Sequence, residues 1–139
     1  MNRISLSGRL SVSAQIHASD VAALAGGGVT LLINNRPDGE LPAHLASVEA
    51  SKLATNQGMA YGYLPVTFAA LSRADVDAFS TAVAQAPGLV HAHCRSGIRS
   101  ASLWSLGRIF AGEDREAVRQ DALARGFDIK EALAWLDLQ

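Results

Sequence analysis

Residues Gly88–Ser100 read GLVHAHCRSGIRS and contain the only cysteine of the chain, Cys94. The apolar run Leu89–His93 predicts a strand, and the helix-like run Ala101–Ala111 follows the loop. A strand, a tight loop and a helix N-terminus form a cradle for an oxyanion, because backbone N–H groups and the helix dipole both favour negative charge there. The same field favours a thiolate at Cys94. The segment therefore predicts an enzyme with a cysteine nucleophile and an anionic substrate.

Composition limits what the chain can be. Its 139 residues suit one domain, 1–139, and 49% hydrophobic residues are enough for a sizeable core. A net charge of −1 gives no electrostatic basis for binding nucleic acid or an anionic membrane, and no apolar run is long enough to span a bilayer. Since there is no disulfide framework and no signal-peptide pattern, we expect a reducing, cytoplasmic location.

Strands and helices are predicted to alternate. The strands are expected at Leu10–Ile16, Val29–Ile33, Tyr61–Val66 and Leu89–His93. This order indicates an α/β fold in three layers, with a mainly parallel sheet of four or five strands and helices on both faces. Because ligands of such sheets bind at the carboxyl ends of the strands, two loops, Asn34–Pro42 and Cys94–Ser100, are expected to face each other across a cleft.

The helices are predicted from caps and from apolar spacing. Ser72 and Asp75 form a capping-box pattern before a helix with an apolar face of Val76, Phe79 and Val83. Ser19 is the expected N-cap of a short helix, Asp20–Ala25. Further helices are expected at His44–Gln57, at Glu113–Arg125 and after Asp128.

The cysteine loop carries residues suited to oxyanion chemistry. Cys94 is the predicted nucleophile, and Arg99 can hold two oxygens of a phosphate or sulfonate in its planar fork. Ser100 is expected to hydrogen-bond the Cys94 sulfur and to help it act as a leaving group. The alternative is a buried structural cysteine, which is common in proteins. The polar, glycine-containing loop at a strand end favours the catalytic interpretation.

Four other loop residues are candidates for substrate binding. Gly97 lets the backbone turn inward where a side chain would block the substrate. Arg95 is expected to point outward and to steer anions, and Ser96 and Ile98 complete the loop whose N–H groups line the cradle.

The other loop, Asn34–Glu40, contains three charged side chains. Arg36 is a candidate substrate-binding cation, and Asp38 is a candidate for the general acid that protonates a leaving oxygen. The alternative for Asp38 is an ordinary turn, because Pro-Asp-Gly is strong turn chemistry. Asp75 is a second candidate acid, although its capping position already accounts for an aspartate there.

His91 and His93 share a strand face without an evident third ligand, so no metal and no cofactor are predicted. His93 is instead expected to brace the loop.

At these residues the chain resembles a known bacterial family, the phosphatase-like domain of beta-lactamase-hydrolase-like proteins. The resemblance covers about Leu10–Ala111 and is carried by Asn34–Glu40, Tyr63–Val66, Cys94–Ser100 and the following Leu103-Trp104. It implies a fold similar to dual-specificity protein tyrosine phosphatases. Cys94 would then form a phosphocysteine, and Arg99 would bind the phosphoryl oxygens.

Two departures from the tyrosine phosphatase pattern leave other functions open. Four residues separate Cys94 from Arg99, whereas tyrosine phosphatases usually have five, and the shorter loop resembles that of rhodanese sulfurtransferases, which form a cysteine persulfide. The segment Thr67–Ala70 contains no carboxylate where the phosphatase pattern expects an aspartate. The expected partner is therefore a small anion, either a phosphate ester or a sulfane sulfur donor. A third possibility is a non-catalytic module that binds phosphate or sulfate esters. The sequence sets no oligomeric state.

Overall fold

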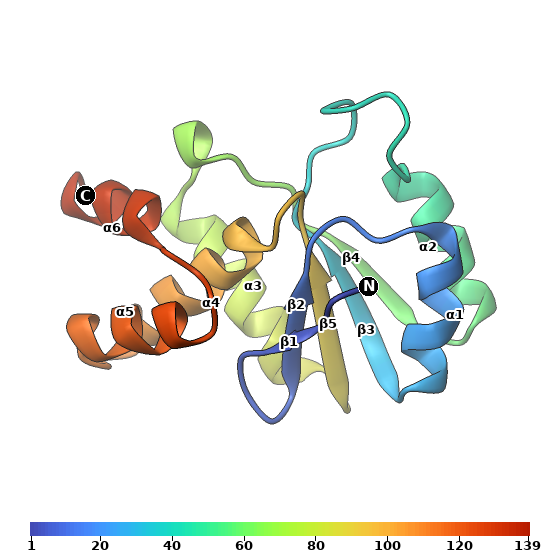
Figure 1. Cartoon of the computed structure of the whole chain (residues 1–139), viewed down its shortest axis with the longest axis horizontal. Helices are drawn as coiled ribbons and strands as arrows, with labels where there is room; N and C mark the ends of the chain where they lie inside the picture. Colours follow the sequence, from blue (N-terminus) through green and yellow to red (C-terminus); the bar gives the residue numbers. More distant parts are fainter.

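A computed structural model describes residues 1–139, and its centre is a five-stranded sheet. The strands lie in the order β1-β2-β5-β3-β4 (Figure 1). Their bounds are Ile4–Ser5 for β1, Leu10–Ser13 for β2, Val29–Asn34 for β3, Ala60–Tyr63 for β4 and Leu89–His93 for β5. All neighbouring pairs are parallel except β1 with β2, which confirms the predicted mainly parallel sheet.

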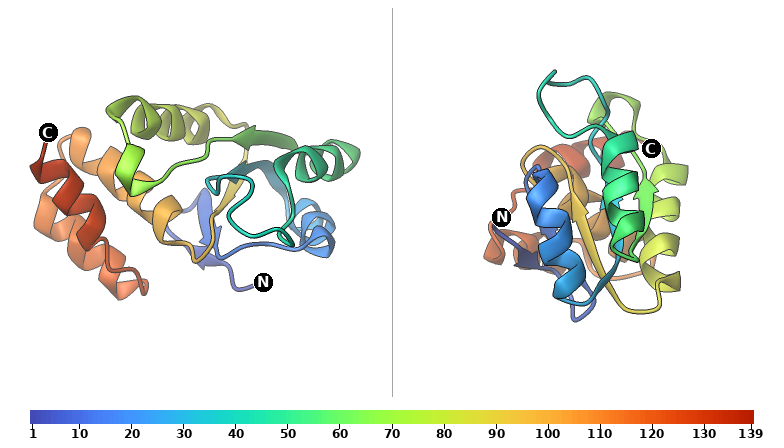
Figure 2. Two further views of the ribbon diagram at one scale, coloured as in Figure 1. Left: turned by 90° about the horizontal axis from the view of Figure 1, so that it is seen from above. Right: turned by 90° about the vertical axis from the view of Figure 1, so that its right-hand side faces the viewer.

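Helices cover both faces of this sheet, as Figures 1 and 2 show. One face carries α1 (Ala18–Gly26) and α2 (Ser47–Asn56). The other side carries the short 3-10 helix η1 (Phe68–Ala70), α3 (Arg73–Gln85), α4 (Ile98–Phe110), α5 (Arg115–Ala124) and α6 (Lys130–Asp137). The predicted three-layer α/β fold is confirmed. No helix combines the length and the apolar character needed to cross a bilayer.

Two apolar clusters hold the layers together. Neighbouring β3 residues point to opposite faces, so Leu32 joins the cluster beneath α1 and α2, while Ile33 joins the larger cluster beneath α3 and α4. Phe79 and Leu106 are fully buried in that larger cluster. Strand β5 lies between β2 and β3, and its residue Val90 is also fully buried. The packed sheet therefore gives the residues that follow β5 a rigid base.

Two helix starts differ from the predictions. Helix α1 begins at Ala18 after His17, whose N–H donates to the Asp20 carboxylate, so Ser19 is not the N-cap. Helix α2 begins at Ser47 rather than His44. Its N-cap residue has no side-chain acceptor, and the carboxylate of Asp38 accepts the Ser47 N–H instead. A cap supplied from outside the helix leaves no local sequence pattern.

Candidate active site

Cys94 directly follows β5 at the carboxyl edge of the sheet, and its side chain is fully buried. The Gly97 N–H donates to the Cys94 sulfur over 3.0 Å. Helix α4 begins at the next residue, Ile98, so the sulfur lies beside a helix N-terminus. This arrangement combines a hydrogen-bond donor with the positive end of a helix dipole at the sulfur, as the sequence predicts.

Gly97 makes this turn possible. Its φ of +97° lies in the left-handed region, which side chains other than glycine rarely adopt. A Cβ at this position would also lie only 3.0 Å from Cε1 of Phe127. The position therefore requires glycine for two independent reasons.

Replacing Gly97 by alanine should destabilise the protein and lower any activity that depends on Cys94. The strained φ alone costs about 1–2 kcal/mol, and the contact with Phe127 adds to it. Urea unfolding and steady-state kinetics check this. Gly126→Ala is the matched control, because Gly126 has φ +94° with open space around its would-be Cβ. If Gly97→Ala matched Gly126→Ala in both stability and activity, the proposed requirement for glycine at position 97 would be wrong.

Arg99 lies in the first turn of α4 and connects the two loops. Its Nη1 and Nη2 donate to the two carboxylate oxygens of Glu40, each over 2.8 Å, and Nη1 also donates to the Val66 carbonyl over 2.9 Å. The Glu40 hydrogen bond is the main reason that the pKa of Arg99 is raised. Arg99 lies in the first turn of the helix that begins beside the sulfur, and its bonds to Glu40 show that the two loops meet as predicted.

Glu40 is the residue whose importance the sequence did not reveal. Its Oε1 accepts from Arg36 Nε over 2.9 Å as well as from Arg99. The Arg99 hydrogen bond is the main reason that the pKa of Glu40 is lowered to about 2, with a second contribution from Arg36. Glu40 is therefore ionised near neutral pH and has no proton to donate to a leaving group.

Replacing Glu40 by glutamine should make the melting temperature depend less on pH in the acid range. Because the folded-state pKa of Glu40 is about 2, below its ordinary 4.5, its ion pairs stabilise fully above pH 4.5 and are lost as the pH falls toward 2. The wild type should therefore lose more melting temperature on acidification than Glu40→Gln does. Thermal unfolding at a series of pH values from neutral to acid checks this, with the exposed Glu49→Gln as control. Parallel profiles for wild type and Glu40→Gln would contradict this role.

Asp38, the candidate acid, lies against α2. Its carboxylate accepts from both the N–H and the hydroxyl of Ser47, and its own N–H donates to the Tyr63 hydroxyl. The Ser47 hydroxyl hydrogen bond is the main reason that the pKa of Asp38 is lowered. Asp38 makes no hydrogen bond to the cysteine loop, so an acid role would require it to leave Ser47.

Ser100 makes a different hydrogen bond from the one expected. Its buried hydroxyl donates to Oδ1 of Asn35 over 2.8 Å rather than to Cys94. Asn35 lies just beyond β3, and its amide also donates to the Leu64 carbonyl. Ser100 therefore ties the start of α4 to the neighbouring strand ends, and the hydrogen bond to the sulfur comes from Gly97.

The remaining loop residues and the histidines occupy distinct environments. Arg95 and Ser96 are exposed, which agrees with an outward Arg95, and Ile98 is half-buried. His91 is buried between the Ser11 and Ser13 hydroxyls, and burial lowers its pKa to about 3.

His93 braces the loop through its backbone. Its carbonyl accepts from the Asn35 N–H over 2.8 Å, whereas neither ring nitrogen has a hydrogen-bond partner. Burial is the main reason that the pKa of His93 is lowered to about 4, so the ring is neutral near pH 7. The imidazole therefore supports the loop as a neutral packing group.

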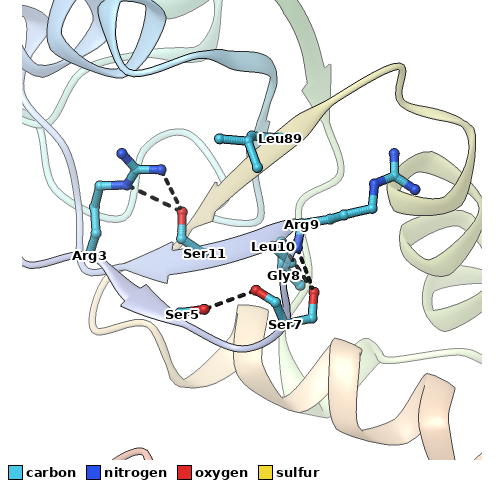
Figure 3. A pocket seen from close by; sticks show the side chains of 8 residues that line it. All are labelled: Arg3, Ser5, Ser7, Gly8, Arg9, Leu10, Ser11 and Leu89. Carbon is cyan, nitrogen blue, oxygen red and sulfur yellow. Dashed lines mark hydrogen bonds between the residues drawn. The ribbon is translucent and has the colours of Figure 1, made fainter.

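Two cavities flank the sheet at opposite ends. One, of about 540 Å³, is lined by Arg95 and lies at the carboxyl edge beside the cysteine loop. The other, of about 320 Å³, lies where β2 and β5 begin and contains Arg3, which donates to Ser11 (Figure 3). Only the first is close to Cys94.

The fold is that of an α/β domain of the protein tyrosine phosphatase type. A solved structure of a provisionally assigned phosphatase from Neisseria meningitidis is 25% identical, with a TM-score of 0.85 over 98% of this chain and 97% of that chain. PTPMT1 shares the fold at a TM-score of 0.76, over 99% of this chain and 95% of its own, with 12% identity.

Sequence comparison then identifies the family. The family model described as "Beta-lactamase hydrolase-like protein, phosphatase-like domain" matches residues 3–111. A beta-lactamase hydrolase-like protein of Agrobacterium fabrum is 34% identical over the whole of this chain, which spans about a third (32%) of that relative. The chain belongs to the family of phosphatase-like domains of beta-lactamase hydrolase-like proteins. Family and fold support a phosphatase-type function.

Proposed function

We propose that this domain hydrolyses phosphate esters through a covalent intermediate on Cys94. The Cys94 thiolate attacks phosphorus, a sulfur–phosphorus bond forms and the ester oxygen departs with its electron pair. Water then attacks the phosphocysteine, which releases inorganic phosphate and restores the thiolate. The observation that carries this proposal is the Cys94 sulfur at the N-terminus of α4, with the Gly97 N–H 3.0 Å away and Arg99 beside it.

Arg99 is the proposed phosphate-binding group. A guanidinium fork matches the spacing of two phosphoryl oxygens and stabilises their charge in the transition state. The Glu40 carboxylate accepts hydrogen bonds from Nη1 and Nη2 of Arg99, whereas Nε of Arg99 makes no hydrogen bond. We infer that Glu40 orients the guanidinium, and that phosphate binds at the edge containing Nε and Nη2.

The charged groups near the loop favour substrates with good leaving groups. Glu40 is ionised, Asp38 is held by Ser47, and Thr67–Ala70 contains no carboxylate. Without a proton donor the leaving oxygen departs as an anion, which an aryl oxygen tolerates far better than an alkyl oxygen. The proposed substrate class is therefore aryl phosphates.

Hydrolysis of p-nitrophenyl phosphate tests this function. We expect release of nitrophenol and phosphate in equal amounts, slow or absent release from an alkyl phosphate, and loss of both in Cys94→Ser. Phosphotyrosine is a second probe, since Pseudomonas aeruginosa TpbA, 22% identical, has been crystallised with phosphotyrosine as a cysteine-to-serine variant. Absence of turnover with every aryl phosphate would overturn the proposal.

Sulfur transfer is a second candidate, favoured by the four-residue spacing between Cys94 and Arg99. The Cys94 thiolate would attack the outer sulfur of thiosulfate, forming a persulfide and releasing sulfite. Cyanide would then take that sulfur as thiocyanate and restore the thiolate. Intact mass after incubation with thiosulfate tests this. An unmodified Cys94 with no thiocyanate formed would exclude it.

A further inference from the structure

The cavity beside the cysteine loop has a lining suited to an anion with an apolar body. It is lined by Arg36 and Arg95, by His17 and His44, and by no aspartate or glutamate. Half of its ten lining residues are hydrophobic. Cationic and apolar surfaces therefore meet in one open cavity of about 540 Å³, which is large enough for an aromatic ring.

Arg36 provides an unsatisfied donor in this lining. Its side chain is only 2% exposed, with Nε bonded to Glu40 and Nη1 bonded to Gln15. Its Nη2 is buried and has no hydrogen-bond partner. A buried charged donor without an acceptor is unfavourable, so an oxygen of a ligand at this nitrogen would relieve that penalty.

The cavity is connected to the cysteine loop through two contacts. Glu40 accepts from both Arg36, which lines the cavity, and Arg99, which lies beside Cys94. The carbonyl of Arg95, the residue after Cys94, accepts from the N–H of Gln15, another lining residue. The cavity and the cysteine loop therefore adjoin each other through Arg95 and through the Arg36–Glu40–Arg99 contacts.

We propose that this cavity binds a carboxylate of the substrate, so that the preferred substrate is an aryl phosphate with a carboxylate on its ring. The phosphate lies at the cysteine loop, the ring packs against the apolar wall, and the carboxylate accepts from Arg36 Nη2. A carboxylate is favoured over a second phosphate because Arg36 offers a single unpaired nitrogen rather than a two-nitrogen fork. This inference rests on the proposed phosphatase function, whose site it extends.

Binding of two non-hydrolysable phosphonates tests the cavity without requiring turnover. Phenylphosphonate and 3-phosphonobenzoate differ only by the ring carboxylate, and their affinities are measured by calorimetry with the wild type. We expect 3-phosphonobenzoate to bind about tenfold more tightly, which corresponds to about one charge-assisted hydrogen bond. The preference should fall severalfold in Arg36→Gln and in Arg95→Gln. Arg95 is exposed, so its variant remains informative if Arg36→Gln fails to fold.

Arg119→Gln, which removes the same charge from α5 far from the cavity, should keep the full preference. Equal affinity of the wild type for the two phosphonates, binding of neither, or a preference unchanged in both arginine variants would overturn the cavity assignment. Turnover of unsubstituted phenyl phosphate separates the two proposals. If it is hydrolysed while the phosphonates bind equally, the cavity assignment fails alone. If neither it nor any other aryl phosphate is hydrolysed while the preference holds, the phosphatase function fails alone.

Discussion

Replacing Cys94 by serine will reduce aryl phosphate turnover roughly 10³-fold or more, because it replaces the nucleophile. The serine hydroxyl would occupy nearly the same place beside the Gly97 N–H, but it must lose a proton to attack. No side chain is hydrogen-bonded at this place to take that proton, because the Gly97 N–H is the hydrogen-bond partner of the Cys94 sulfur.

Steady-state kinetics on p-nitrophenyl phosphate, with a higher enzyme concentration for the slow variant, measures this loss. The variant should keep the wild-type melting temperature and should still bind phenylphosphonate, since Arg99 and the loop N–H groups remain. Turnover within a few-fold of wild type in Cys94→Ser would show that Cys94 is not the nucleophile.

Replacing Arg99 by lysine should lower kcat/KM for aryl phosphates by roughly 10²–10³-fold, although the positive charge is kept. Lysine cannot form the two-nitrogen fork, and it would lose the paired hydrogen bonds that fix Arg99 on Glu40. The loss should be larger in kcat than in the affinity for phenylphosphonate, because the fork is best matched to the transition state.

The control for Arg99→Lys is Arg119→Lys, the same change at a partly exposed arginine of α5 paired with Glu116. It should leave kcat/KM unchanged. If Arg99→Lys kept the wild-type kcat/KM, a positive charge alone would be sufficient at this position. That result would contradict the proposed binding of two phosphoryl oxygens by the guanidinium fork.

The β5–loop–α4 unit could be predicted from the sequence because its determinants are local. Leu89–His93 was predicted as a strand and is β5 with the same bounds. Gly97 was expected at the turn for its conformational freedom and has a φ of +97°. The capping box of Ser72 and Asp75 is also present, since both partners lie within one helical turn.

The pairing of Glu40 with Arg99 could not be predicted, because the two lie 59 positions apart in the sequence. The sequence showed three charged residues in the Asn34–Glu40 loop but not which one reaches the cysteine loop. Asp38 was the candidate by chemistry, yet it caps α2 through Ser47, a contact that depends on how the chain folds back. The Ser100 hydroxyl was likewise expected at the sulfur and donates to Asn35, which comes from another strand end.

These contacts bear on the choice between phosphate and sulfur chemistry. Both reactions use the thiolate of Cys94 and the positive charge of Arg99. They differ in what remains bonded to sulfur after the first step, a phosphoryl group or a second sulfur atom. Because the Glu40 carboxylate is paired with two arginines and the Asp38 carboxylate accepts from Ser47, we expect hydrolysis of a phosphocysteine to be slow enough for the intermediate to accumulate.

The most direct test is therefore the mass of the Cys94 peptide after rapid acid quenching of the enzyme with excess p-nitrophenyl phosphate. The proposed mechanism predicts one phosphoryl group on Cys94, formed with a burst of nitrophenol of about one equivalent of enzyme and absent in Cys94→Ser. Steady release of nitrophenol with an unmodified Cys94 peptide and no burst would contradict it.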